Sequence, residues 1–267
     1  MSVPAYRVQA INTATASSNK MHDDSVARLY GFAGGLVPGV DVWAYLCHLP
    51  AETWGRDWLA QGGLEARFVA PIYDGQEVTV EAIVVEHANG RDGDALDLTA
   101  QNPSGQACAL GRAHRSVGDP GPDVAAYPLA PLPDPPSPAA SPEYFDQHPV
   151  LGTSQATWRA GSSYLDSVRE HLPVFRDSGL APPGWLLRRA NDVLVQNVTL
   201  GPWIHVESRV RHLDVVADGE VVSTRARVVE HYERKGHRFV ELDVLMLVSD
   251  RPVVMARHVA IYQPRRA

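Results

Sequence analysis

The feature that most constrains the fold of this 267-residue chain is an internal repeat. Short segments of the first half recur in the second half at a nearly constant distance, and a fixed period indicates a duplicated structural unit. The offset is 144 residues in three cases and 145 in a fourth. The matching segments are Asp74-Gly75 with Asp218-Gly219, Val84-Val85-Glu86-His87 with Val228-Val229-Glu230-His231, His114 with His258, and Pro38-Gly39 with Pro183-Gly184. We therefore predict two diverged copies of one unit.

A proline-rich segment separates the two copies. Ten of the 31 residues from 119 to 149 are proline, which has no backbone N–H to donate to a helix or a sheet. We predict that this segment is an extended surface linker without regular structure of its own. The predicted units are then residues 1–118 and residues 150–267, joined by the linker at 119–149.

Both copies show the same order of predicted elements, in which a turn precedes an apolar helix and strands follow. The helices are expected at Val40–His48, which Pro50 would end, and at Trp185–Gln196. The strands are rich in β-branched residues. They are expected at Glu77–Glu86, Leu96–Gln101, Ala107–Ser116, Val221–Glu230, Arg238–Val248 and Pro252–Gln263, with hairpin turns at Asn89-Gly90 and Lys235-Gly236.

One buried helix followed by a meander of antiparallel strands predicts an α+β unit whose helix covers one sheet face. Two such units side by side would form one longer sheet, or two sheets packed through their helices.

Composition excludes several classes of protein. The net charge of −7 does not favour a nucleic-acid or anionic-membrane partner. Cys47 and Cys108 alone make neither a disulfide scaffold nor a zinc site, and the eleven histidines lack metal-ligand spacing. We find no signal peptide and no apolar stretch near the roughly 20 residues of a membrane span. The sequence therefore predicts a cytoplasmic protein without a metal.

The segment from Ser17 to Gly39, SSNKMHDDSVARLYGFAGGLVPG, is the most informative for function. It resembles the signature of the MaoC-like (R)-specific enoyl-CoA hydratases. That signature reads Asp-x-Asn-Pro-x-His, then a short helix, Gly-Phe and a glycine-rich turn that ends in His-Gly at the central helix. The residues that match it are Asn19, His22, Ala27, Gly31, Phe32 and Gly39.

The resemblance implies a double hot-dog fold, with antiparallel sheets wrapped around central helices. It also implies a hydratase or dehydratase that acts on an acyl thioester, with acyl-CoA as substrate and no other cofactor. Three positions depart from the signature: Ser17 replaces its catalytic Asp, Lys20 its Pro, and Pro38 its second His. Because a serine hydroxyl does not ionise near neutral pH, two alternatives stay open. They are a hot-dog thioesterase and a non-catalytic protein that binds acyl thioesters or another small ligand.

His22 is the candidate general base, since an unperturbed histidine has a pKa near ~6.5. Its alternative role is a loop-closing hydrogen bond to the backbone. Asn19 is a candidate for positioning water or a thioester carbonyl, or else forms an Asx-turn. Asp24, or Asp23, could orient His22, although both directly precede a predicted helix and could instead cap it.

Gly39 and Val40 begin the predicted buried helix of the first copy. Unpaired N–H groups at a helix N-terminus can stabilise an anionic oxygen such as that of a thioester enolate. Gly184 is the repeat mate of Gly39, but the repeat places Ser167 at the position of His22 and Tyr164 at that of Asn19. The second copy is therefore expected to be degenerate and to shape the acyl or pantetheine tunnel.

The remaining predictions concern partners. Arg188, Arg189, Arg209 and Arg211 are candidates for CoA phosphates, with a plain surface role as the alternative. Trp203 is expected to pack where the two copies meet. A homodimer is the candidate assembly.

Overall fold

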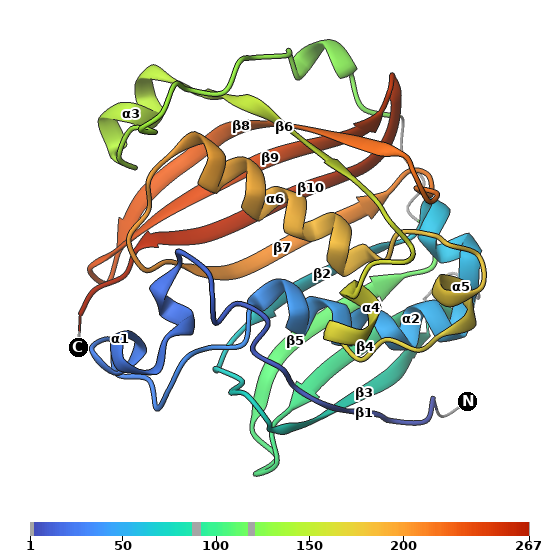
Figure 1. The fold of residues 1–267 in the computed structure, drawn as a ribbon. Coiled ribbons are helices and arrows are strands. Elements are labelled where there is room, and N and C mark those ends of the chain that lie inside the picture. The colour runs from blue at the N-terminus through green and yellow to red at the C-terminus, as the bar shows by residue number, and fades with distance from the viewer. Residues whose placement is uncertain (1–2, 87–91, 117–120, 267) are drawn as a thin grey trace.

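The computed structural model describes residues 3–86, 92–116 and 121–266. Within them, ten strands form one antiparallel sheet in the order β1-β3-β4-β5-β2-β7-β10-β9-β8-β6 (Figure 1). The predicted turn at Asn89-Gly90 lies outside the described residues. The predicted turn at Lys235-Gly236 is present, and both residues have the positive φ that a tight hairpin of this kind requires.

The strand order is the same in the two halves, read outward from the centre of the sheet. The first half runs β2-β5-β4-β3-β1 and the second runs β7-β10-β9-β8-β6, so each strand has a counterpart five places later. In the first half these are β1 (Tyr6–Gln9), β2 (Gly63–Phe68), β3 (Glu77–Glu86), β4 (Asp92–Gln101) and β5 (Ala107–His114). In the second half they are β6 (Val150–Thr157), β7 (Ile204–His212), β8 (Val221–Arg234), β9 (His237–Val248) and β10 (Arg251–Gln263).

Strand register follows the repeat as well. His114 lies opposite Gly63 in the β2–β5 pair, and its repeat mate His258 lies opposite Ser208 in the β7–β10 pair. The halves join where β2 pairs with β7. The predicted double hot-dog α+β fold is confirmed, and of the two expected arrangements the protein has the single longer sheet.

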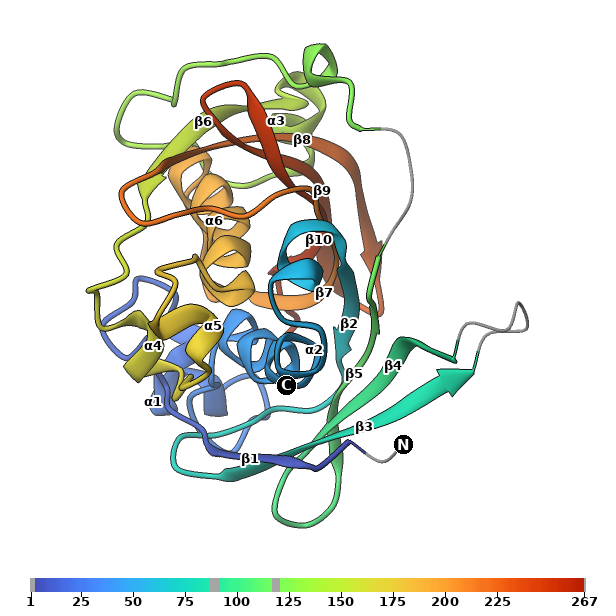
Figure 2. The same ribbon diagram turned by 90° about the vertical axis from the view of Figure 1, so that its right-hand side faces the viewer.

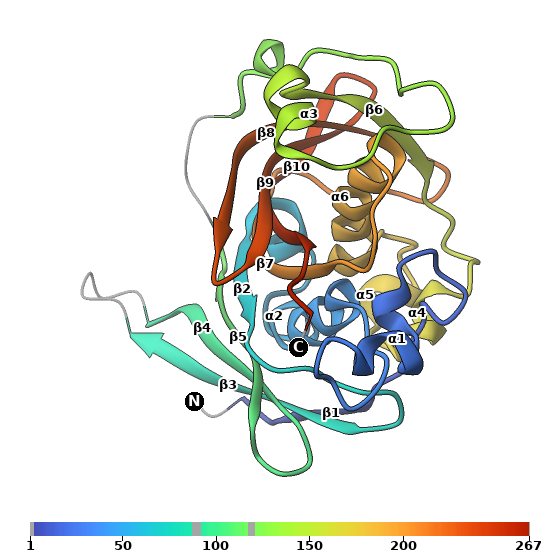
Figure 3. The same ribbon diagram turned by 90° about the vertical axis from the view of Figure 1, so that its left-hand side faces the viewer.

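Two long helices, α2 (Gly39–Gln61) and α6 (Pro183–Asn197), lie on the same side of the sheet, which curves around them (Figures 2 and 3). They approach so closely that a Cβ on Gly184 would lie 2.6 Å from the Cβ of Ala44. A buried ion pair also joins them, because Asp41 of α2 is fully buried and lies 2.5 Å from the guanidinium of Arg188 on α6. The two halves therefore share one hydrophobic core.

The remaining helices are short and lie in the loops. They are η1 (Lys20–His22), α1 (Asp24–Arg28), η2 (Val124–Ala126), α3 (Pro142–Gln147), α4 (Tyr164–Ser167) and α5 (Pro173–Arg176). None of the helices in the described residues is both long and apolar enough to cross a lipid bilayer.

The prediction that Pro50 ends the first helix is wrong. α2 continues to Gln61 and leaves helical geometry only at Gly55, where φ is 57°. The helix resumes because Trp58 and Leu59 beyond the glycine are buried in the core. A buried tryptophan and leucine contribute several kcal/mol, which offsets the roughly 3 kcal/mol cost of an internal proline.

The expectation that 119–149 lacks regular structure is also wrong in part. Its described part, residues 121–149, runs along the edge of the second half (Figure 1) and contains η2 and α3. Pro142 does not prevent α3 because it occupies the first helical turn, where no N–H partner is needed. Ser141 caps the helix by accepting a hydrogen bond from the amide of Tyr144, and Phe145 anchors it in the core.

Two buried histidines of the central strands make the fold sensitive to acid. Burial lowers the pKa of His212 on β7 to about 4 and that of His258 on β10 to about 3. Both are therefore neutral in the folded protein at neutral pH. In the unfolded chain each has a pKa near ~6.5.

We predict that the free energy of unfolding falls as the pH drops below ~6.5. The unfolded chain then takes up protons that the folded protein excludes, until the pH reaches the folded values of about 4 and 3. Each histidine should cost about 2 kcal/mol between pH 7 and pH 5. Urea unfolding at both pH values measures this loss, and His212→Phe should reduce it by about 2 kcal/mol. An unchanged pH dependence in that variant would contradict the assignment.

Candidate active site

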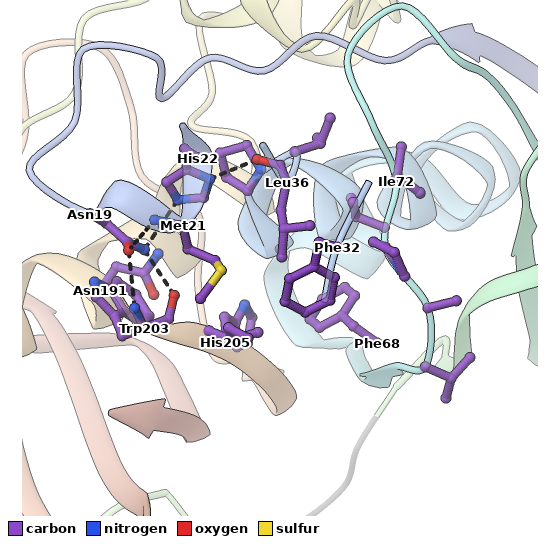
Figure 4. A pocket seen from close by; sticks show the side chains of 18 residues that line it. Asn19, Met21, His22, Phe32, Leu36, Phe68, Ile72, Asn191, Trp203 and His205 are labelled. Carbon is purple, nitrogen blue, oxygen red and sulfur yellow. Dashed lines mark hydrogen bonds between the residues drawn. The ribbon is translucent and has the colours of Figure 1, made fainter. Parts of the chain in front are cut away.

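A cavity of about 190 Å³ lies where the two halves meet. Its polar lining comes from Asn19, His22 and Gly39 of the first half and from Asn191, Trp203 and His205 of the second. Polar groups gather at one end of the cavity, whereas Phe32, Phe68 and Ile72 lie at the other (Figure 4). The structure thus brings three predicted site residues into one cavity.

The buried side chain of Asn19 joins the two halves through hydrogen bonds. Its Oδ1 accepts hydrogen bonds from the amides of Met21 and Trp203, both at 3.1 Å. Its Nδ2 donates to the carbonyl of Trp203 at 3.0 Å and lies 3.2 Å from Nε2 of His22 (Figure 4). Because two N–H donors converge on one atom, that atom must be the oxygen. Asn19 therefore orients His22 and also fixes Trp203, which lies at the junction as expected.

His22 is held as a neutral imidazole with a defined tautomer. Its Nδ1 lies 2.7 Å from the carbonyl oxygen of Leu36. A carbonyl only accepts, so Nδ1 carries the proton and Nε2 keeps a lone pair. Burial lowers the pKa of His22, although the Leu36 carbonyl and the charge of Asp41 oppose this shift. The hydrogen bond to the backbone that we considered as an alternative role is thus present, and the lone pair of Nε2 accepts the hydrogen bond from Nδ2 of Asn19.

The N-terminus of α2 forms another part of the wall. Gly39 is its first residue and lines the cavity, and first-turn N–H groups have no partner within a helix. His205 packs against this glycine so closely that a Cβ there would lie 2.9 Å from Nδ1 of His205. Glycine is therefore required at position 39. Val40 is buried in the core and does not line the cavity.

Asp24 lies outside the cavity lining, which does not fit the predicted role beside His22. Its Oδ1 accepts a hydrogen bond from the amide of Gly35 at 2.7 Å, and the side chain is exposed. Asp23 caps α1 by accepting from the amides of Ser25 and Val26. Both carboxylates therefore stabilise the loop that holds His22.

Ser17 occupies the position of the signature's catalytic Asp, and it also stays outside the cavity lining. Its hydroxyl accepts a hydrogen bond from the amide of Asn19 at 3.1 Å. Among the described residues that line the cavity, none carries a carboxyl group. Proton transfer in this cavity is therefore left to histidine, water or the ligand itself.

The corresponding place in the second half is filled. Tyr164, the repeat mate of Asn19, is buried, and its hydroxyl lies 2.5 Å from the position of a Cβ on Gly184. Arg188 stacks over its ring at 4.9 Å. The ring of Tyr164 thus lies against the start of α6. The equivalent start of α2 in the first half faces the cavity.

The four arginines considered for CoA phosphates, all within the described part of the chain, lie outside the cavity lining. Arg188 is paired with Asp41, and Arg189 pairs with Asp192 and stacks over Trp185. Arg209 and Arg211 lie on β7. The pairing of Arg188 and Arg189 favours structural roles for both.

His205 and Asn191 line the cavity and were missed in the sequence analysis. Strand alternation counted back from the inward-facing Ser208 would place His205 on the opposite sheet face. A β-bulge reverses this, because Val259 pairs with Glu207 and Ala260 with His205, which leaves Val206 as the extra residue. Nothing in the sequence marks that bulge. Asn191 sits on α6, where only tertiary packing decides that it faces the cavity.

No protein-family model matches this chain, and no curated protein matches it in sequence. Solved structures do resemble it in fold. A protein from Chloroflexus aurantiacus J-10-fl described as a MaoC domain dehydratase has a TM-score of 0.63 and 12% identity, over 100% of this chain and 96% of its own. A conserved hypothetical protein from Mycobacterium tuberculosis with a double hotdog fold has a TM-score of 0.57 and 16% identity, over 98% and 96%.

A protein from Novosphingobium aromaticivorans DSM 12444 described as a thioesterase is also similar. Its TM-score is 0.53 and its identity 12%, over 97% of this chain and 95% of its own. The chain therefore resembles in fold, over nearly its whole length, a MaoC domain protein, a double hotdog protein and a protein described as a thioesterase. The predicted resemblance is confirmed at the level of fold.

We predict that Asn19→Ala lowers the free energy of unfolding by about 2–4 kcal/mol, because it leaves buried backbone groups of Met21 and Trp203 unpaired. Urea unfolding measures the change. Ser17→Ala removes a single, less buried contact and should cost about 1 kcal/mol or less. If both variants lost the same free energy of unfolding, Asn19 would not be the residue that joins the two halves.

Proposed function

We propose that the protein acts on acyl thioesters of the acyl-CoA type, as a hydratase or dehydratase. The observation that carries this proposal is the single cavity that His22, the N-terminus of α2 and an apolar pocket share. A 2-enoyl thioester offers a matching set of groups: an apolar chain, a carbonyl oxygen and a β-carbon that water attacks.

In this proposal His22 moves the proton. The lone pair of Nε2 accepts a hydrogen bond from Asn19, and it would take up a proton from an attacking water once that water displaces the amide, while Leu36 holds the other ring nitrogen. The resulting imidazolium can return that proton to the α-carbon, so that water adds across the double bond. Asn19 positions the ring through its Nδ2.

The thioester oxygen would bind at the start of α2. As negative charge develops on that oxygen, the amide of Gly39, which lines the cavity, and the helix dipole stabilise it. Gly39 has no side chain of its own, and the imidazole of His205 packs against it, so the oxygen would reach the Gly39 amide beside that ring. The acyl chain would then extend toward Phe32, Phe68 and Ile72, and the small cavity favours a short chain.

Thioester hydrolysis is the second candidate. The specific observation in its favour is that no described residue lining the cavity carries a carboxyl group, and Ser17 replaces the signature's Asp. Hydrolysis needs one base to activate water and one site for the oxyanion, and the cavity offers both. A non-catalytic binding protein, a homodimeric assembly and a cytoplasmic location remain predictions from the sequence.

Turnover of 2-enoyl-CoA esters tests the proposal. Loss of the enoyl chromophore reports hydration, and release of free thiol, followed separately, reports hydrolysis. We predict hydration by the wild type and a loss of about 10²–10⁴-fold in His22→Ala, because that variant lacks the general base. The control is His148→Ala, which changes an exposed histidine of the second half and should keep full activity.

Release of free thiol that is lost in His22→Ala would show that the protein hydrolyses thioesters rather than hydrating them. If the wild type acts on no thioester, a stabilisation of about 2.7 kcal/mol at a hundredfold ligand excess over Kd would identify a binding protein instead. Inactivity without any such stabilisation would overturn the proposal.

A further inference from the structure

The cavity wall contains a polar chain that the proposed mechanism does not use. Nε2 of His205 lies 2.8 Å from the hydroxyl of Ser208, and that hydroxyl lies 2.9 Å from Nδ1 of His258. The exposed fraction is 6% for His205 and 0% for both Ser208 and His258. Buried polar side chains in a sheet core are costly unless they are paired, so this chain calls for an explanation.

The backbone departs from regular pairing to build this chain. The bulge at Val206 turns His205 to the same sheet face as Ser208, and bulges commonly re-aim a side chain near a functional site. The ring of His205 then reaches the cavity between the polar and the apolar ends (Figure 4).

Hydrogen-bond counting favours one tautomer of His205. A serine hydroxyl has one proton, so Ser208 donates to one histidine and accepts from the other. Nδ1 of His205 and Nε2 of His258 have no partner among the described residues. If Ser208 donated to His258, an N–H would be left unpaired deep in the core. If it donates to His205 instead, the unpaired N–H is that of His205, at the cavity wall beside Gly39.

Burial keeps both rings neutral, which makes this arrangement stable at neutral pH. Burial and the neighbouring His258 lower the pKa of His205 well below its ordinary value, although a backbone hydrogen bond with Glu207 opposes this shift, and burial lowers the pKa of His258 to about 3. A neutral His205 with its proton on Nδ1 is a hydrogen-bond donor with a fixed direction. The cavity otherwise has few donors of this kind, since the amide of Asn19 is already shared between Trp203 and His22.

We propose that His205 is a catalytic residue that donates a hydrogen bond from Nδ1 to the thioester carbonyl oxygen, beside the amide of Gly39. Ser208 and His258 are positioning residues that fix its tautomer. This inference rests on the proposed thioester chemistry and adds a second group that polarises the carbonyl in a cavity whose described lining has no carboxyl group.

Three variants and one matched control test the role in turnover. His205→Phe keeps the ring shape without the donor and should lower kcat for 2-enoyl-CoA about 10²–10³-fold, as expected for the loss of one oxyanion donor. His205→Asn keeps a side-chain N–H and should retain more activity than His205→Phe. Ser208→Ala should lower kcat while KM changes little. The variant no longer fixes the tautomer of His205, but the His205 ring still lines the cavity.

The control is His212→Phe. His212 is equally buried on the same strand and also has a ring nitrogen without a described partner, but it lies outside the cavity lining. It should keep kcat within about threefold of the wild type, a change of well under one kcal/mol in barrier. Equal losses in His205→Phe and His212→Phe would overturn the inference.

A measurement on the wild type separates this inference from the proposed function. Butyryl-CoA is a saturated ester that cannot be hydrated, and histidine-selective NMR follows each ring as it binds. We expect the signals of both His22 and His205 to shift, and the Nδ1 proton of His205 to persist. A shift of His22 alone would overturn the role of His205 and leave the proposed function standing. A shift of neither would overturn both, whereas a shift of His205 in a protein without turnover would support the contact and refute the reaction.

Discussion

The side-chain amide of Asn19 is the contact on which the site depends. It satisfies both backbone groups of Trp203 in the second half and reaches His22 in the first. These three hydrogen bonds connect the two halves and set the direction of the imidazole. Because the side chain of Asn19 is buried, water cannot readily replace these hydrogen bonds, and breaking them costs free energy. The cavity between the halves is thereby held open in one geometry.

Fusion of two units into one chain explains how the two potential sites could become different. In the first half the start of α2 faces an open cavity, whereas in the second half Tyr164 lies against Gly184 at the start of α6. Arg188 of α6 stacks over that ring and also pairs with Asp41 of α2. One half thus serves the candidate chemistry and the other supplies part of the wall, through Asn191, Trp203 and His205.

The sequence predicted the parts of the fold that follow from local chemistry. The constant repeat offset anticipated the matching strand orders, and the β-branched run at Glu77–Glu86 gave the bounds of β3. The strands that join the halves, β2 and β7, were not predicted, although the turn-forming pairs Gly62-Gly63 and Gly201-Pro202 stand at or just before their starts. Pro50 misled for the opposite reason: a strong local signal was outweighed by the burial of Trp58.

The candidate site was predictable where it depends on a contiguous motif. Asn19, His22 and Gly39 belong to one such motif, and they do line one cavity. His205 was not predictable, because its direction depends on a bulge set by pairing with β10. Asp24 was misassigned because a carboxylate beside a histidine in sequence turns away to bind the amide of Gly35.

A crystal structure with bound butyryl-CoA tests the central claim most directly, since it asks where an acyl thioester lies. The account predicts the thioester oxygen at roughly 2.7–3.1 Å from the amide of Gly39, with the acyl chain between Phe32 and Phe68 and the β-carbon facing His22. Density for the acyl group elsewhere on the protein, with the cavity between the halves empty, would contradict it.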